Sequence, residues 1–228
     1  MSTQLQSIAI IPARGGSKRL HRKNIRLVNG KPLLSYPICS ALSSGCFDKV
    51  IVSSDDHEIL GIGADNGAET FLRDTSLSND MATVDQVCLD VLSHHNYLSS
   101  YSFCCIYPTS IFLTSDDFVA SMNILDEETD FVMGVSNYNF HPFQAMKVEN
   151  SYLKQMWPEY DELKSQQYPE MYVSNGSLYW AKTEVFKKEK TFYGNRLKGF
   201  AVDTIDINNE DDLINAQSRA SCIGLKIT

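Results

Sequence analysis

The sequence predicts an α/β protein that has one mostly parallel β-sheet with helices on both of its faces. Short apolar segments alternate with amphipathic segments from residue 7 to residue 136, which is the pattern of successive strand–helix units. The apolar segments have few polar interruptions, as expected of strands that are buried on both sides. A length of 228 residues and a hydrophobic content of 43% suit a single domain over residues 1–228.

The first strand is predicted at residues 7–13 (SIAIIPA), where an apolar run ends at Pro12 and two glycines follow. A helix is predicted over residues 32–45, because its apolar residues recur at helical spacing and Gly45 suits a C-terminal cap. Pro37 lies inside this helix and is expected to kink or shorten it.

The alternation of strands and helices continues to the middle of the chain. Strands are predicted at 48–54, 68–73, 101–109 and 130–136, and helices at 55–67, 83–95 and 115–127. The helix at 55–67 begins with Asp55 and Asp56, whose carboxylates suit helix capping. A Ser or Asp residue is expected to cap the helix at 115–127.

The pattern changes at residues 138–180. This segment is rich in Tyr, Met and Gln and contains short alternating stretches such as QAMKVE and YLKQMW. We expect an inserted segment of short antiparallel strands that forms a homodimer interface, because aromatic and Met residues favour protein–protein contacts. The α/β pattern returns with strands at 177–182 and 199–207 and a closing helix at 209–220.

Positive charges are gathered near the beginning of the chain. The net charge is −8, yet the first 47 residues hold seven Lys and Arg residues and no Asp or Glu. An acidic protein of this kind is not expected to be a general nucleic-acid binder. A local cationic loop suits a small polyanion, and the alternative is an ordinary solvated basic surface.

The remaining composition argues against membrane insertion and disulfide bonding. The apolar run near the start, IAII, is too short for a signal or membrane-spanning segment. The six cysteines show no CxxC spacing, so we expect reduced thiols in a cytoplasmic protein.

The loop after the first strand has the residue types that a phosphate site needs. Ligands of parallel α/β sheets bind at the carboxyl ends of the strands, where this loop begins. Gly15 and Gly16 allow close backbone approach with exposed N–H groups, and Arg14 and Lys18 supply charge-assisted bonds to phosphate oxygens. The loop contains neither GxxxxGK[ST] nor GxGxxG, which excludes a P-loop NTPase and a standard dinucleotide-binding protein.

The stretch IIPARGGSKRLHRKNI, residues 10–25, resembles the signature IPARxGSKxxxxKN of the acylneuraminate cytidylyltransferase family. The similarity continues through KPLLSYPICSAL, FDKVIVSSDDHEI, GAETFLRD, YPTS, NGSLYW and IDINNEDDL. The resemblance implies a Rossmann-like fold of the nucleotide-diphospho-sugar transferase type. It also implies an enzyme that couples CTP to a nine-carbon 2-keto sugar acid (a nonulosonic acid), releases pyrophosphate, requires Mg²⁺ and dimerises through the inserted segment.

The same resemblance implies roles for individual residues. Those that match the CTP site are Arg14, Gly15, Gly16, Ser17, Lys18, Lys23, Asn24, Arg73 and Thr83. Arg14, Lys23 and Asp206 are expected to act in catalysis, Asp206 as a metal-binding aspartate with Asn208 as its companion on Mg²⁺. The expected sugar contacts are Tyr107, Gln166, Tyr172 and Asn175.

Two departures from the family pattern leave the substrate open. Tyr107 stands where many sialic-acid enzymes have glutamine, which favours sugars such as pseudaminic acid, whereas SNGSLYW is similar to the sialic or legionaminic type. Asn208 stands where some relatives carry a second aspartate, and it offers Mg²⁺ an oxygen without charge.

Alternatives also remain for the activity and for single residues. One is a cytidylyltransferase for another sugar acid such as Kdo, and another is a non-catalytic nucleotide-binding protein of the same fold. For Asp206 the alternative role is a helix cap, and no side chain is an evident general base.

Overall fold

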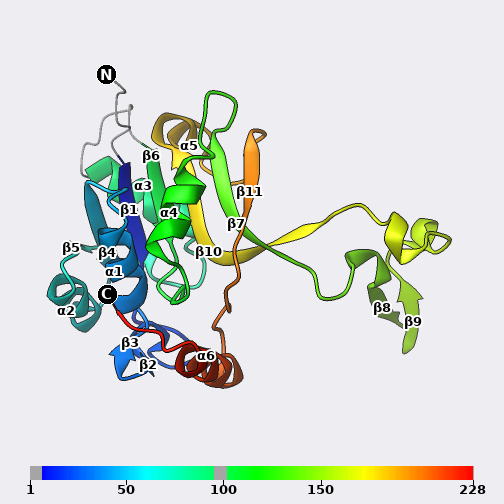
Figure 1. Ribbon diagram of the computed structural model, residues 1–228, viewed down its shortest axis with the longest axis horizontal. Coiled ribbons are helices and arrows are strands. Elements are labelled where there is room, and N and C mark those ends of the chain that lie inside the picture. The colour runs from blue at the N-terminus through cyan, green and yellow to red at the C-terminus, as the bar shows by residue number, and fades with distance from the viewer. Residues whose placement is uncertain (1–6, 95–101, 228) are drawn as a thin grey trace.

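The computed structural model describes residues 7–94 and 102–227, and its centre is a seven-stranded sheet with the order β11-β7-β10-β6-β1-β4-β5 (Figure 1). The strands are β1 (Ser7–Pro12), β4 (Lys49–Ser54), β5 (Glu69–Leu72), β6 (Ser102–Ile106), β7 (Phe131–Asn137), β10 (Tyr172–Lys182) and β11 (Leu197–Ala201). Strand β10 runs antiparallel to β6 and β7, and the other neighbours are parallel. The predicted mostly parallel sheet is therefore confirmed.

Helices cover both faces of the sheet, as predicted. They are α1 (Ser35–Ser43), α2 (His57–Asp65), α3 (Val84–His94), α4 (Ser115–Met122), α5 (Thr183–Glu189) and α6 (Glu210–Cys222). Ala9 and Ile11 of β1 share an apolar core with residues of α1, α2 and α4. Ile8 and Ile10 share the opposite core with residues of α3 and α5. Successive residues of a strand point to opposite faces, so one apolar run contributes to two cores.

A third apolar cluster fastens the chain after β1 to the C-terminal helix. It joins Leu20 and Val28 with Ile111, which follows β6, and with Ile207 and Leu213 at α6. In this region β2 (Leu27–Val28) and β3 (Lys31–Pro32) form a short antiparallel hairpin that the sequence did not predict, and Figure 1 shows it beside α6. The cluster holds the segment that precedes α6 close to the loop that follows β1.

Two helices differ from the predictions for local reasons. Helix α1 begins at Ser35 and ends at Ser43, so it is shorter than predicted, and Pro37 lies in its first turn, where its missing N–H removes no intrahelical hydrogen bond. Helix α4 ends at Met122 rather than at residue 127, and its cap is Thr114 in a capping box with Asp117. The expected Ser or Asp cap was wrong at this helix.

The cap of α2 agrees with the prediction. The Asp56 carboxylate accepts hydrogen bonds from the backbone N–H groups of Glu58 and Ile59. It satisfies two of the amides that have no partner inside the helix and places a negative charge at the positive end of the helix dipole.

The last third of the chain departs further from the prediction. The strand expected at 199–207 is β11, which ends at Ala201, and residues 202–208 have no regular structure. Helix α5 was not predicted. The predicted helix at 83–95 and strand at 101–109 reach His95 and Tyr101, which lie outside the described residues. None of the described helices is long and apolar enough to cross a membrane.

Residues 138–171 form an arm that projects away from the sheet between the end of β7 and the start of β10 (Figure 1). Within it β8 (Met146–Glu149) pairs antiparallel with β9 (Tyr152–Gln155), as expected for the inserted segment. Phe143 stacks on Tyr160 with ring centroids 3.8 Å apart at the centre of the arm's aromatic packing. Strand β10 begins at Tyr172 and returns to the main sheet, so the insertion ends before the predicted residue 180.

Candidate active site

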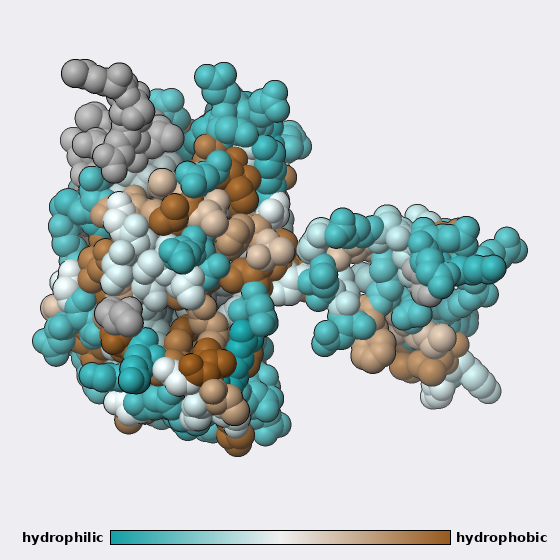
Figure 2. Space-filling model, viewed as in Figure 1, coloured by the Kyte–Doolittle hydropathy of each residue, from teal (hydrophilic) through white to brown (hydrophobic). Residues whose placement is uncertain are grey.

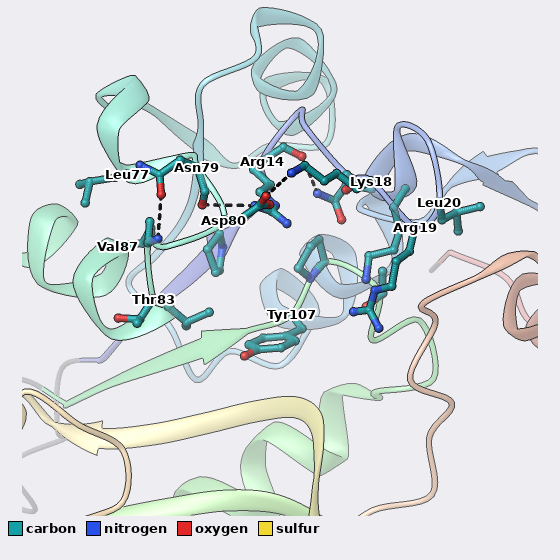
Figure 3. A pocket seen from close by; sticks show the side chains of 18 of the residues that line it. Arg14, Lys18, Arg19, Leu20, Leu77, Asn79, Asp80, Thr83, Val87 and Tyr107 are labelled. Atoms are coloured by element: carbon teal, nitrogen blue, oxygen red, sulfur yellow. Dashed lines mark hydrogen bonds and ion pairs between the residues drawn. The ribbon is translucent and has the colours of Figure 1, made fainter.

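A cleft of about 280 Å³ opens at the carboxyl ends of β1 and β6. Four stretches line it: the end of β1 with the loop after it, the loop between β5 and α3 with the start of α3, the turn after β6, and Asn208 before α6. Figure 3 shows side chains of the first three stretches around the cleft. Its volume lies near the lower end of the roughly 300–1,000 Å³ that is typical of small-molecule sites. Ligands of parallel α/β sheets bind at this edge, so the cleft lies where the sequence predicts a site.

Arg14 and Lys18 both point into the cleft and both contact one carboxylate, that of Asp80 (Figure 3). Arg14 Nη1 donates to Asp80 Oδ1 at 3.0 Å and to the backbone oxygen of Asn79 at 3.2 Å. The Lys18 ammonium forms an ion pair with the other oxygen of the same carboxylate. These contacts lower the pKa of Asp80 below its ordinary value. The two cations predicted to hold phosphates are therefore side by side.

Two other basic residues near the beginning of the chain, Arg22 and Arg26, are balanced by carboxylates from distant parts of the chain. Arg22 pairs with Asp56 and Glu58, and Arg26 pairs with Glu210 through both of its terminal nitrogens. The prediction of an unbalanced cationic loop therefore needs a correction, because Arg22 and Arg26 tie the loop to α2 and α6 through ion pairs.

Gly15 and Gly16 were expected to expose their N–H groups to a ligand, but the structure gives Gly15 a different role. The Gly15 N–H is not exposed to a ligand, because it donates to Asp55 Oδ1 at 3.0 Å. A Cβ on Gly15 would lie 2.7 Å from Asp56 Oδ2, so the absence of a side chain lets the loop pack against the start of α2. A Cβ on Gly16 would meet nothing within 4 Å. Ser17 lines the cleft.

Lys23 and Asn24 lie deeper and connect the loop to other parts of the site. Lys23 Nζ donates to the backbone oxygen of Ile207 at 2.8 Å. Burial lowers the pKa of Lys23, and the nearby Asp206 carboxylate opposes that shift. Asn24 is buried and donates to the backbone oxygen of Arg14 at 2.9 Å. This hydrogen bond fixes the backbone of Arg14, a residue predicted to bind phosphate.

Arg73 and Thr83 line the opposite wall of the cleft. The Arg73 side chain is only 3% exposed, its Nε donates to Ser78 Oγ at 3.0 Å, and burial lowers its pKa. Thr83 Oγ1 accepts from the backbone N–H of Gln86, and the Gln86 side chain accepts from the Thr83 N–H. Thr83 therefore caps the start of α3 and borders the cleft as well.

The four predicted sugar contacts do not lie together. Tyr107 lines the cleft, and burial raises the pKa of its phenol. Asn175 is buried beside β7, where its Nδ2 donates to Ser136 Oγ and to the Val202 backbone oxygen. Gln166 lies exposed on the arm, and Tyr172 lies at the start of β10 with its hydroxyl on Glu170. Within the described residues of one chain, only Tyr107 of these four lines the cleft.

Asp206 and Asn208 lie on either side of Ile207, whose backbone oxygen accepts the hydrogen bond from Lys23. Asp206 is exposed, and a Cβ on Gly176 would lie 3.7 Å from its Cγ and 3.5 Å from the Tyr107 ring. Asn208 Oδ1 accepts from Arg19 Nη2 at 2.9 Å. The helix cap of α6 is Asn209, with Asp212 completing a capping box, so the alternative reading of Asp206 as a cap is wrong. No group of three or more His, Cys, Asp or Glu side chains that could hold a metal occurs among the described residues.

Two residues of the site were not predicted from the sequence. Asp80 lies in the irregular loop SLSNDMAT, and only the fold brings it to Arg14 and Lys18. Gly176 adopts a φ of +63° and leaves open the space between Tyr107 and Asp206. The glycine that follows Asn175 in NGS was the one local signal in the sequence for a backbone with positive φ at this position.

Comparison with protein families gives a match between residues 8–214 and the family described as cytidylyltransferase. The chain belongs to the cytidylyltransferase family. The match covers every strand of the central sheet from Ile8 onward and all the loops that line the cleft.

Curated relatives come from several bacteria. The pseudaminic acid cytidylyltransferase of Campylobacter jejuni serotype O:2 is 34% identical over 81% of this chain and 82% of the relative. The CMP-N,N'-diacetyllegionaminic acid synthase of Legionella pneumophila is 29% identical over 88% of each chain. The N-acylneuraminate cytidylyltransferase of Escherichia coli O18:K1:H7 is 31% identical over 90% of this chain, which spans 50% of that longer relative.

Solved structures agree with the fold. A CMP:2-keto-3-deoxy-manno-octonic acid synthetase complexed with CTP superimposes with a TM-score of 0.71 over 96% of this chain and 99% of that one, at 14% identity. A 4-diphosphocytidyl-2C-methyl-D-erythritol synthase from Anaerococcus prevotii gives a TM-score of 0.67 over 96% of this chain and 97% of that one, at 13% identity. At these identities the likeness concerns the fold, which is the predicted nucleotide-diphospho-sugar transferase type.

Proposed function

We propose that this cytidylyltransferase couples CTP to a nonulosonic acid and yields the CMP-sugar and pyrophosphate. The observation that carries the proposal is the convergence of Arg14, Lys18 and Lys23 on one cleft at the carboxyl end of β1. The family membership and the names of the curated relatives support the choice of nucleotide and of sugar acid.

The reaction needs a site that binds the negatively charged triphosphate of CTP and orients the hydroxyl of the sugar that attacks it. The anomeric oxygen of the sugar attacks the α-phosphorus of CTP, the bond from that phosphorus to the β-bridging oxygen breaks, and pyrophosphate leaves with its electron pair. Lys23 stabilises the α-phosphate, and Arg14 and Lys18 stabilise the departing pyrophosphate. The protein thus acts mainly by positioning groups and by electrostatic stabilisation.

The donor set beside the cleft fits Mg²⁺ when CTP is present. Asp206 offers an exposed carboxylate and Asn208 an amide oxygen. Mg²⁺ commonly binds to one or two carboxylates together with substrate phosphates, so these two residues would hold it. When bound, it would neutralise phosphate charge and lower the pKa of the attacking hydroxyl.

We propose that the enzyme is a cytoplasmic homodimer that meets its copy through the arm. The six cysteines are all free, which fits a reducing compartment. The arm's hairpin is amphipathic: Met146, Val148 and Leu153 share one face, and 56%, 73% and 67% of their surfaces are exposed. Figure 2 shows apolar residues gathered on this projecting part. A two-stranded hairpin is marginal alone, so a partner that covers this face would stabilise it.

A pyrophosphate-release assay with CTP, Mg²⁺ and a panel of sugar acids tests the proposed function. The panel contains pseudaminic, legionaminic and N-acetylneuraminic acids, with Kdo as the comparison substrate. We expect the kcat/KM of at least one nonulosonic acid to exceed that of Kdo by about tenfold or more. A site that hydrogen-bonds the nine-carbon sugar would leave some of its polar groups unpaired when Kdo binds, and such groups discriminate strongly between substrates. Preference for Kdo, or no turnover with any of the three, would contradict the proposal.

A further inference from the structure

Asp80 carries the one carboxylate among the described residues that line the cleft. Each of its two carboxylate oxygens contacts a different cation. Oδ1 accepts from Arg14, and Oδ2 pairs with Lys18. Arg14 also donates to the backbone oxygen of Asn79, the neighbour of Asp80. A carboxylate therefore occupies the positions at which the proposed function expects phosphate oxygens.

The contacts of Asp80 are of the kind that a ligand can replace. The side chains of Asp80, Lys18 and Arg14 are 46%, 79% and 36% exposed. Ion pairs at this exposure are worth little in water, because solvent competes and long side chains lose freedom. Phosphates carry more charge and more acceptor oxygens than one carboxylate, so they compete well for the same donors.

The loop that carries Asp80 is braced by its own hydrogen bonds. Asn79 Oδ1 accepts from the N–H groups of Met81 and Ala82, and Asn79 Nδ2 donates to the backbone oxygen of Ser76. None of these bonds uses the Asp80 side chain. Neutralising Asp80 therefore leaves the internal bracing of the loop intact.

We propose that Asp80 is an internal counter-ion that holds Arg14 and Lys18 at the cleft in the free enzyme and is exchanged for the β- and γ-phosphates of CTP. It is a positioning residue that acts through these two cations. Before CTP arrives it offsets the repulsion between the two positive charges. It weakens triphosphate binding by competition, and it pairs with both cations again when pyrophosphate leaves. The inference rests on the proposed function, which assigns these cations to the β- and γ-phosphates.

Calorimetric titration of wild type and of Asp80→Asn with CTP, with pyrophosphate and with CMP, each with Mg²⁺, tests this exchange. We expect Asp80→Asn to bind CTP and pyrophosphate about three- to tenfold more tightly, the range that two exposed ion pairs allow. Affinity for CMP should be unchanged, because CMP has no phosphate at these positions. The KM for CTP should fall, and kcat should fall with it if departure of pyrophosphate limits turnover.

Two matched variants control for charge and shape. Asp80→Glu keeps the carboxylate and should restore affinities near those of wild type. Asp116→Asn removes the same charge from the first turn of α4, outside the cleft, and should change nothing. The exchange is refuted if Asp80→Asn binds CTP and pyrophosphate no more tightly than wild type, or if CMP tightens by the same factor. Failure of the wild type to bind CTP would instead refute the proposed function, while the pyrophosphate titration would still decide whether Asp80 competes for the cations.

Discussion

Lys23 is a cation whose position costs the fold free energy. Burial lowers its pKa, and the neighbouring Arg19 and Arg14 lower it further, although Asp206 opposes them. Since the pKa in the folded protein lies below that of the unfolded chain, the unfavourable contribution is fully present at any pH below the lowered pKa. It is relieved only as the pH rises through the lowered value. A bound phosphate would offset this contribution, which is the behaviour expected of a residue held in place for a ligand.

Replacing the phosphate cations should separate activity from stability. We expect Lys23→Met and Arg14→Ala each to lower kcat about a hundredfold, or about 3 kcal/mol of transition-state stabilisation. The melting temperature should stay close to that of wild type, because Lys23 is destabilising and the Arg14 ion pair is exposed. Steady-state kinetics with thermal melts measure both quantities, and Lys31→Ala, a cation of β3 outside the cleft, is the control. Near wild-type kinetics in both variants would contradict the assigned roles.

The metal role of Asp206 can be separated from CTP binding. We expect Asp206→Asn to lose most activity while CTP still binds through Arg14 and Lys18, because the role proposed for the carboxylate is to bind Mg²⁺ and not to hold these cations. Asn208→Asp should be tolerated and should lower the Mg²⁺ concentration for half-maximal activity, since it adds a charge beside the same ion. Metal titrations of activity at saturating CTP measure both effects. Full activity of Asp206→Asn at an unchanged Mg²⁺ optimum would show that the metal binds elsewhere.

At the beginning of the chain, the residues that the sequence groups in one motif also lie together in the structure. Arg14, Ser17, Lys18, Lys23 and Asn24 are close in sequence, and the structure gathers them at one edge of the sheet. Asp80 was missed because its role arises from a contact across 66 positions of the chain. No local pattern distinguishes such a residue from any other acidic loop residue.

At the scale of elements, β10 is the strand with the least regular pairing. Its register against β7 shifts between Ser174 and Tyr179, so the residues in between bulge. Gly134 of β7 lies opposite this bulge, where a Cβ would be 2.1 Å from Ser177 Oγ. The bulge also carries Gly176, which borders the space between Tyr107 and Asp206. The shape of the site thus depends on one glycine in a neighbouring strand.

Gly134→Ala should therefore destabilise the protein. We expect the free energy of unfolding to fall by about 1–3 kcal/mol, because the added methyl overpacks a buried contact. Adding Ser177→Ala removes the clashing oxygen and should recover part of the loss. Gly61→Ala in α2, where a Cβ meets nothing within 4 Å, should be neutral or slightly stabilising. Denaturant unfolding measures all three, and a Gly134→Ala protein as stable as wild type would show that the bulge can move aside.

The regular elements were predictable because each carries its own periodicity, and the irregular ones were not. The apolar runs of β1, β4 and β6 and the amphipathic α2 and α3 were found close to their observed bounds. The antiparallel direction of β10 could not be predicted, because direction depends on how the chain returns from the arm. Residues 202–207 were predicted as the end of a strand, but Ile207 instead packs in the third apolar cluster with residues of α6.

At the scale of the whole molecule, the arm should set the oligomeric state. We expect light scattering to give twice the chain mass of 25.7 kDa at micromolar concentration. Val148→Asp with Leu153→Asp should give monomers, because these register partners form the apolar face of the hairpin. Lys147→Ala changes the opposite face and should remain dimeric. A wild-type protein that is monomeric throughout would contradict the proposed interface.

Phosphorus NMR of a reaction that contains CTP, Mg²⁺ and a nonulosonic acid tests the central claim most directly, because it follows every phosphate of the substrate. We expect the three resonances of CTP to be replaced by one phosphodiester resonance of the CMP-sugar and by pyrophosphate in equal amounts. This should occur only when the sugar acid is present. Persistence of CTP with pseudaminic, legionaminic and N-acetylneuraminic acids alike, or consumption of CTP without a phosphodiester product, would show that the protein does not catalyse the proposed reaction.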